Sequence, residues 1–193
     1  MKSFLAKHAH YFNKGDKLKA EATKEGKTET EAEIKTKNQQ IYSKISEDFK
    51  KKHNIKPTDV WYPDFSRKYI TDMSEMFRGS ELSGIDLSQW NTSNVTDMSG
   101  MFYKAQNIPE SIGNLNTSNV TNMSYMFRYA QNIPESIGNW NTSNVTNMSW
   151  MFYKAQNIPE SIGNWNTNNV TDMGAMFSTE QNIPESVRRK FRI

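Results

Sequence analysis

Residues that commonly catalyse reactions or bind metals are few in this 193-residue chain. There are no cysteines, which excludes disulfides and thiolate metal sites. The histidines are His8, His10 and His53, and the first two are typical of a polar terminus rather than of a metal site. No nucleophile, base and orienting group occur in an arrangement that favours catalysis. We therefore expect no enzymatic activity, no metal and no cofactor.

One acidic residue recurs at a fixed interval, as Glu110, Glu135, Glu160 and Glu185. If the repeats stack, these like charges lie in register and repel one another. Solvation or local capping accounts for such a column, and a calcium ion bridging several carboxylates is the alternative. The sequence leaves open whether the column binds cations.

Aromatic and basic residues gather at positions that change between otherwise constant repeats. This composition is typical of the residues that dominate protein interfaces. Large rings give contact area at a small entropic cost, and adjacent cations add directional or stacking contacts. Sideways packing of the rings on neighbouring repeats is the alternative. The predicted partner-binding residues are Tyr103, Lys104, Tyr125, Arg128, Tyr129, Trp150, Tyr153 and Lys154.

A tandem repeat of 25 residues must position these side chains. The segment 90–98 recurs almost unchanged in the later units, and a degenerate copy precedes it. A unit this short cannot bury its apolar residues alone, so neighbouring units must stack. The units begin near residues 65, 90, 115, 140 and 165.

Each unit is predicted to contain a short helix and a short strand. Thr96 suits the start of the helix as an N-cap, and Pro109 prevents its continuation. The stretch that begins at Ile112 and runs into the next unit is expected to form the strand and a tight turn. We expect the methionine and phenylalanine columns to be buried in every unit. The helix is predicted from apolar residues at helical spacing, namely Met98, Met101, Phe102 and Ala105.

Residues 1–57 form a charged segment that differs from the repeats in 58–193. Ile41, Ile45 and Phe49 lie on one face of a helix predicted over about residues 38–54. We expect this helix to cover the first repeat, because an uncapped end exposes apolar surface. For the stretch 17–37, a helix, a hairpin and a solvated tether are all compatible with the sequence.

Charge and hydropathy limit the classes of partner. The formal net charge is only +3, from 24 basic and 21 acidic residues, which argues against a nucleic-acid partner. No apolar run approaches the roughly 18–20 residues of a transmembrane helix. No apolar stretch of about 7–15 residues marks a secretory signal near Met1.

The motif Trp-Asn-Thr-Ser-Asn-Val-Thr-Asp-Met-Ser-x-Met-Phe at residues 90–102 resembles the repeat of BspA-like leucine-rich-repeat surface proteins, bacterial proteins whose repeat also occurs in mycoplasmal surface lipoproteins. The resemblance implies an α/β repeat fold. In detail, this is a right-handed leucine-rich-repeat-like solenoid of about five strand-and-helix units, here with an N-terminal helical cap. Two features depart from the family: residues 108–112 read Ile-Pro-Glu-Ser-Ile, and no signal peptide or lipobox cysteine is visible.

The expected function is a non-enzymatic binding or adhesion module whose aromatic and basic face meets a protein or glycan partner. The resemblance implies display at the cell surface or secretion, whereas the missing signal peptide leaves a cytoplasmic location open. An intracellular scaffold is one alternative. An ice-binding protein is another, but Thr92 and Thr96 are four residues apart and do not form paired rows. The threonine column that this alternative would use is Thr92, Thr117, Thr142 and Thr167.

Overall fold

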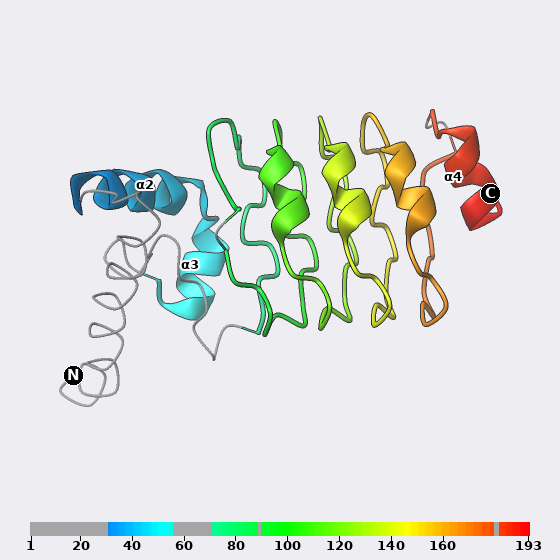
Figure 1. The fold of residues 1–193 in the computed structure, drawn as a ribbon, viewed down its shortest axis with the longest axis horizontal. Coiled ribbons are helices and arrows are strands. Elements are labelled where there is room, and N and C mark those ends of the chain that lie inside the picture. The colour runs from blue at the N-terminus through cyan, green and yellow to red at the C-terminus, as the bar shows by residue number, and fades with distance from the viewer. Residues whose placement is uncertain (1–30, 56–70, 89, 180–181) are drawn as a thin grey trace, which may run out of the picture. The chain divides into compact units, whose positions relative to one another are not determined.

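A computed structural model describes residues 31–55, 71–88, 90–179 and 182–193 (Figure 1). The chain divides into two compact units, Met1–Thr36 and Lys37–Ile193, and the division falls inside the first described helix. No helix among the described residues is long and apolar enough to span a membrane. The helices are α2 (Glu31–Lys44), α3 (Glu47–His53), α4 (Glu185–Phe191) and the 3₁₀ helices η1 (Glu110–Asn114), η2 (Glu135–Asn139) and η3 (Glu160–Asn164).

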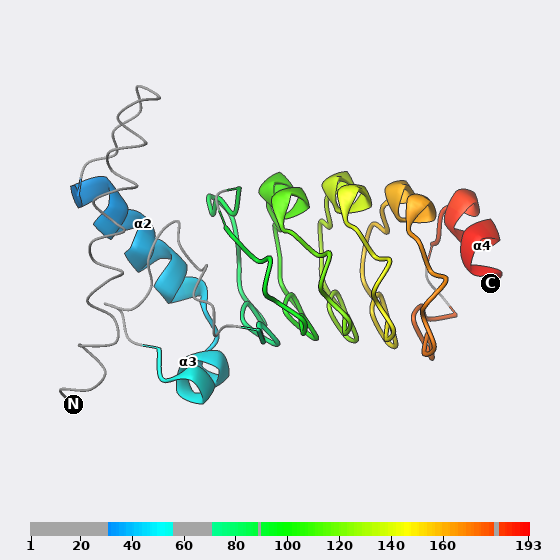
Figure 2. The same ribbon diagram turned by 60° about the horizontal axis from the view of Figure 1, so that its bottom comes forward.

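Successive repeats lie side by side and are joined through backbone groups one repeat apart (Figures 1 and 2). The N–H of Met98 donates to the carbonyl of Asn122 at 3.0 Å. The N–H of Phe102 donates in the same way to Met126 at 3.0 Å. Isolated parallel bridges follow the same register, at Asp72–Asp97, Asp97–Asn122, Asn122–Asn147 and Asn147–Asp172.

The predicted α/β unit of one strand and one helix is wrong, and with it the leucine-rich-repeat-like solenoid of such units. Single-residue bridges take the place of strands in the described ranges, and residues 98–105 form consecutive turns instead of a helix. Alternate N–H groups explain this result. Those of Met98, Gly100 and Phe102 donate to the next repeat, while those of Met101, Tyr103 and Ala105 donate three residues back. Neither a continuous helix nor a continuous strand is compatible with this alternation.

The helical turn of each repeat lies after the proline that was predicted to end a helix. Pro109 is the N-cap of η1 with φ −73° and ψ 150°, close to the φ that its ring imposes. Ile112, predicted to begin the strand, is instead a buried residue of η1. The same Pro-Glu-Ser-Ile-Gly-Asn sequence produces η2 and η3 in the following repeats.

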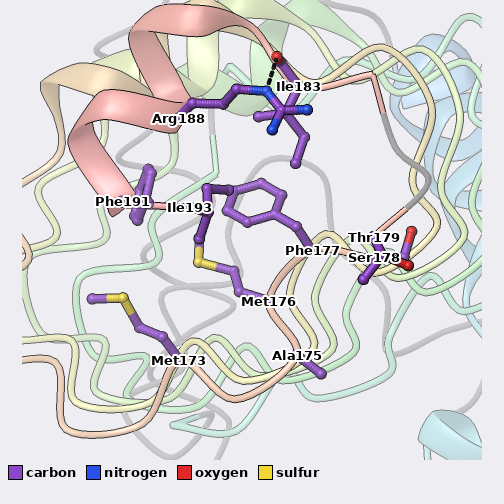
Figure 3. Close-up of a pocket in the computed structure, with 10 residues that line it drawn as sticks. All are labelled: Met173, Ala175, Met176, Phe177, Ser178, Thr179, Ile183, Arg188, Phe191 and Ile193. Carbon is purple, nitrogen blue, oxygen red and sulfur yellow. Dashed lines mark hydrogen bonds between the residues drawn. The ribbon is translucent and has the colours of Figure 1, made fainter.

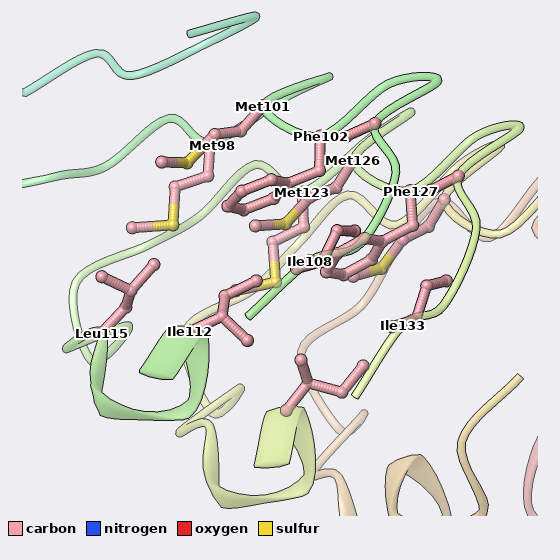
Figure 4. Close-up of a cluster of buried hydrophobic side chains, with 14 of the residues drawn as sticks. Met98, Met101, Phe102, Ile108, Ile112, Leu115, Met123, Met126, Phe127 and Ile133 are labelled. Atoms are coloured by element: carbon pink, nitrogen blue, oxygen red, sulfur yellow. The ribbon is translucent and has the colours of Figure 1, made fainter. Parts of the chain in front are cut away.

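The core is built from side chains that stack on their counterparts in the next repeat (Figure 4). The rings of Phe77, Phe102, Phe127 and Phe152 follow one another at centroid distances of 5.5–5.7 Å. Burial of the methionine and phenylalanine columns is confirmed up to Phe152. The last repeat differs, because Met173 and Phe177 are only partly buried.

Threonine and asparagine columns satisfy backbone groups of neighbouring repeats. The buried hydroxyls of Thr92 and Thr117 donate to carbonyls of the following repeat, at 2.9 and 3.0 Å. Asn119 Nδ2 donates to the Ser93 carbonyl of the preceding repeat at 2.6 Å. Because Thr142 is buried as well, the column that the ice-binding alternative requires does not form an exposed face.

The cap predicted as one helix over about residues 38–54 is divided between α2 and α3. Ile41, Ile45 and Phe49 are buried in the same cluster as the first described repeat. Ser46 interrupts the helix: its N–H donates to the Met76 carbonyl at 2.7 Å, and its hydroxyl accepts the N–H of Phe49. The predicted boundary at 57/58, the stretch 17–30 and the start of the first repeat lie outside the described residues.

His53, the last residue of α3, makes this cap sensitive to pH. Its ring lies 4.4 Å from that of Phe49, and its Nε2 is buried without a hydrogen-bond partner among the described residues. Burial lowers the pKa of His53 below its ordinary value of 6.5; Asp72 opposes this shift and Lys52 adds to it. The unfolded chain therefore takes up the proton more readily than the folded chain. The contribution of neutral His53 to the free energy of unfolding is fully present above pH 6.5. It is lost progressively as the pH falls from there toward the lower pKa of the folded state.

We expect the midpoint of urea unfolding to decrease between about pH 7 and pH 5, because protonation of His53 is less favourable in the folded cap than in the unfolded chain. His53→Gln removes the titrating group and should flatten this dependence. Urea titrations of both proteins, followed by circular dichroism at several pH values, measure the effect. Equal slopes for the two proteins would contradict it.

Candidate functional site

The eight predicted partner-binding residues lie together on the turns of three consecutive repeats. Arg128 is at their centre, and its guanidinium carbon lies 4.8 Å from the ring centroid of Trp150 and 5.2 Å from that of Tyr153. Tyr129, Tyr125 and Tyr103 follow at 5.2, 5.5 and 6.0 Å. The lysines lie at the edges of this group: Lys104 is near Tyr103 and Tyr129, and Lys154 is near Tyr153. We call these eight residues the aromatic–basic cluster.

The rings of the cluster also contact one another. Tyr125 and Trp150 are parallel within 2°, with centroids 6.2 Å apart. Tyr129 meets Tyr103 and Tyr153 edge to face, at 5.9 and 6.1 Å. Tyr125 is 38% exposed, both lysines are exposed, and the other members are half-buried. Side chains of this cluster therefore pack against rings of the neighbouring repeats and are also accessible to solvent.

Several residues of the cluster have strained backbone conformations, which the sequence did not predict. Tyr125 and Trp150 have φ of 58° and 59°, in the left-handed region that bulky residues avoid. The equivalent residue of the preceding repeat is Gly100, also with positive φ. A second left-handed column runs through Gly79, Lys104, Tyr129 and Lys154. Gly79 begins the second column, whereas the first begins at Glu75 with φ 58°, so glycine marks one position in each column.

Two further residues belong to this surface and were not predicted. Arg78 lies over the ring of Tyr103, with its guanidinium carbon 4.8 Å from the centroid. Its Nη1 forms an ion pair with Glu75 Oε1 at 2.9 Å. Arg78 occupies the same column as Tyr103 and Arg128, one repeat earlier, so the repeat register was a signal for it.

In the glutamate column, Glu135 caps the first turn of η3 in the next repeat. The carboxylate of Glu135 accepts the N–H groups of Glu160 and Ser161 in the next repeat, both at 3.0 Å. Partial burial raises the pKa of Glu135, but these hydrogen bonds outweigh it and the net pKa lies below the ordinary value. No group of three or more acidic, histidine or cysteine residues that is suited to a metal ion occurs in the described part of the chain.

A shallow pocket of about 360 Å³ lies at the C-terminal end of the repeats (Figure 3). Its walls are mainly apolar and come from the last repeat and from α4 and its flanks, including Met176, Phe177 and Phe191. Arg188 Nε donates to the Ile183 carbonyl at 3.2 Å. Among the described residues, no acidic or histidine side chain lines this pocket, and its lining offers mainly apolar contact.

Comparison with known proteins gives one match. The model of a family described as "Mycoplasma protein of unknown function, DUF285" matches residues 43–157 and, in a second alignment, residues 71–189. Both matched ranges contain the whole aromatic–basic cluster. No curated protein and no solved structure matches the chain.

Proposed function

We propose a binding function for this chain, which belongs to the family described as "Mycoplasma protein of unknown function, DUF285". In this proposal the chain is not an enzyme, and the aromatic–basic cluster meets a protein or glycan partner. The observation that carries the proposal is the placement of half-exposed rings at backbone positions where glycine is favoured, at Tyr125 and Trp150.

Magnitudes favour binding over packing as the reason for these rings. A non-glycine residue in the left-handed region costs about 1–2 kcal/mol. The parallel contact between Tyr125 and Trp150 contributes about 0.5–1.5 kcal/mol beyond the apolar area that it buries, and both rings also contact the Arg128 guanidinium. Two strained conformations together cost about 2–4 kcal/mol, which this ring–ring contact alone does not offset. Backbone strain that the ring–ring contact does not offset is typical of functional sites.

Glycine substitutions separate the two explanations. Tyr125→Gly with Trp150→Gly removes the rings and the backbone strain together, so the melting temperature should change little. A ligand is first identified by screening the wild-type chain against immobilised matrix proteins and glycans. Affinity for this ligand should then fall by about 2 kcal/mol or more, as for other interface anchors.

Ala175→Gly is the matched control, because Ala175 stands in the same left-handed column but carries no ring. It should raise stability slightly and leave the affinity unchanged. If the double glycine variant is strongly destabilised but its folded form binds the ligand with unchanged affinity, the rings are packing residues and the proposed site is wrong.

The resemblance of residues 90–102 to BspA-like repeats supports a location at the cell surface or a secreted form, with adhesion as the role. An intracellular scaffold is the alternative. Treating intact cells with protease, followed by immunodetection of this chain, distinguishes them: a surface protein is degraded, and an intracellular one is protected.

A further inference from the structure

The guanidinium of Arg128 is surrounded by rings but has no oxygen partner among the residues that the structure describes. Five ring centroids lie 4.8–6.0 Å from its central carbon. Within the described ranges, its Nε is buried without a hydrogen bond, and none of the ion pairs uses this guanidinium. A guanidinium carries five N–H donors in a planar fork, and a buried donor without a partner costs free energy. The geometry therefore leaves Arg128 ready to accept an anionic ligand.

The charge around Arg128 is positive and largely uncompensated. Lys104 and Lys154 are exposed and take part in no ion pair within the described ranges. The carboxylate of Glu75 is close to this surface, but Arg78 already binds it. Complementary charge of this kind steers an acidic partner to the site and fixes its register.

The donors and rings together indicate which anion fits. Apart from tyrosine hydroxyls, the polar groups of the cluster only donate hydrogen bonds, and an ionised carboxylate only accepts them. A carboxylate also matches the guanidinium fork through two parallel hydrogen bonds. Sugar hydroxyls donate as well as accept, so a saccharide would need more acceptors than the cluster provides. The exposed rings suit an apolar side chain next to the carboxylate.

We infer that the partner contributes an acidic polypeptide segment in which Asp or Glu stands next to an aromatic or aliphatic residue. This inference rests on the proposed function and specifies its ligand. Arg128 binds the carboxylate, and Lys104 and Lys154 attract neighbouring acidic residues. Tyr125 and Trp150 contact the apolar side chain.

The test measures binding of the whole chain to immobilised probes of defined chemistry. One set consists of synthetic peptides in which Glu alternates with Tyr or Leu, and a second set replaces each Glu by Gln. Neutral and sulfated oligosaccharides form a third set. We expect the acidic peptides to bind, and their Gln counterparts to bind roughly thirty-fold more weakly or worse. Arg128→Gln should cause a similar loss toward the acidic peptides, and Arg128→Lys should restore part of it.

Arg189→Gln is the control, because it removes the same charge from an exposed residue of α4; its affinity for the acidic peptides should equal that of wild type. Equal binding of Glu and Gln peptides, or an Arg128→Gln variant with wild-type affinity, would overturn the inference but not the proposed function. Binding to oligosaccharides alone would also overturn the inference but not the proposed function, and it would identify a glycan ligand. A wild-type chain that binds no probe in any set would contradict both.

Discussion

Replacing Phe127 by alanine is expected to lower the free energy of unfolding by about 3–5 kcal/mol. Phe127 is fully buried and lies between Phe102 and Phe152, at centroid distances of 5.6 and 5.5 Å. The ring of Trp140 is 5.8 Å away on a third side. Held by backbone bonds to both neighbouring repeats, the site cannot collapse to fill the space that the ring leaves. Urea unfolding followed by circular dichroism measures the loss.

Phe177→Ala is the matched comparison for this prediction. Phe177 stacks on Phe152 at 5.7 Å and meets Phe191 edge to face, but it is only partly buried. The cost of its removal should be clearly smaller than that of Phe127. If both variants lose the same stability, ring burial within the column does not determine the cost.

The sequence predicted which side chains are buried better than it predicted the backbone. Met98, Met101, Phe102 and Ala105 follow helical spacing, and all four are buried. Consecutive turns place the same residues inward, because every second N–H group bonds to the neighbouring repeat. Apolar spacing within one repeat carries no information about bonds between repeats. The periodicity was therefore compatible with a helix that does not form.

The repeat register predicted which residues form the candidate site, but it did not predict their backbone conformation. Variable positions such as Tyr125 and Trp150 stand out because the residues around them are constant. Their positive φ was indicated only by Gly100 in the equivalent position. Since glycine is also common in ordinary turns, a single glycine did not distinguish a strained column from a flexible loop.

Gly138→Ala should destabilise the chain by about 2–3 kcal/mol, because it overpacks the contact between two 3₁₀ helices. A Cβ on Gly138 of η2 would lie 2.4 Å from the Cβ of Ser161 in η3 and 3.2 Å from its carbonyl oxygen. Ser161 is not free to move away. Its hydroxyl donates to the Glu135 carbonyl at 2.7 Å, and its N–H donates to the Glu135 carboxylate at 3.0 Å. Thermal unfolding of the variant measures the loss.

Gly163→Ala tests whether this close contact is the cause. Gly163 occupies the same place in η3, but the next element is α4, and the nearest atom to a new Cβ is the Ser186 carbonyl oxygen at 4.0 Å. Alanine fits there without displacing a neighbour, and it removes the backbone freedom that glycine has in the unfolded chain. We therefore expect this variant to gain about 0.4–1 kcal/mol. Equal destabilisation by Gly138→Ala and Gly163→Ala would show that the helical turn itself rejects a side chain. Opposite signs would show that contact between neighbouring repeats, through Gly138 and Ser161, sets how closely the 3₁₀ helices approach.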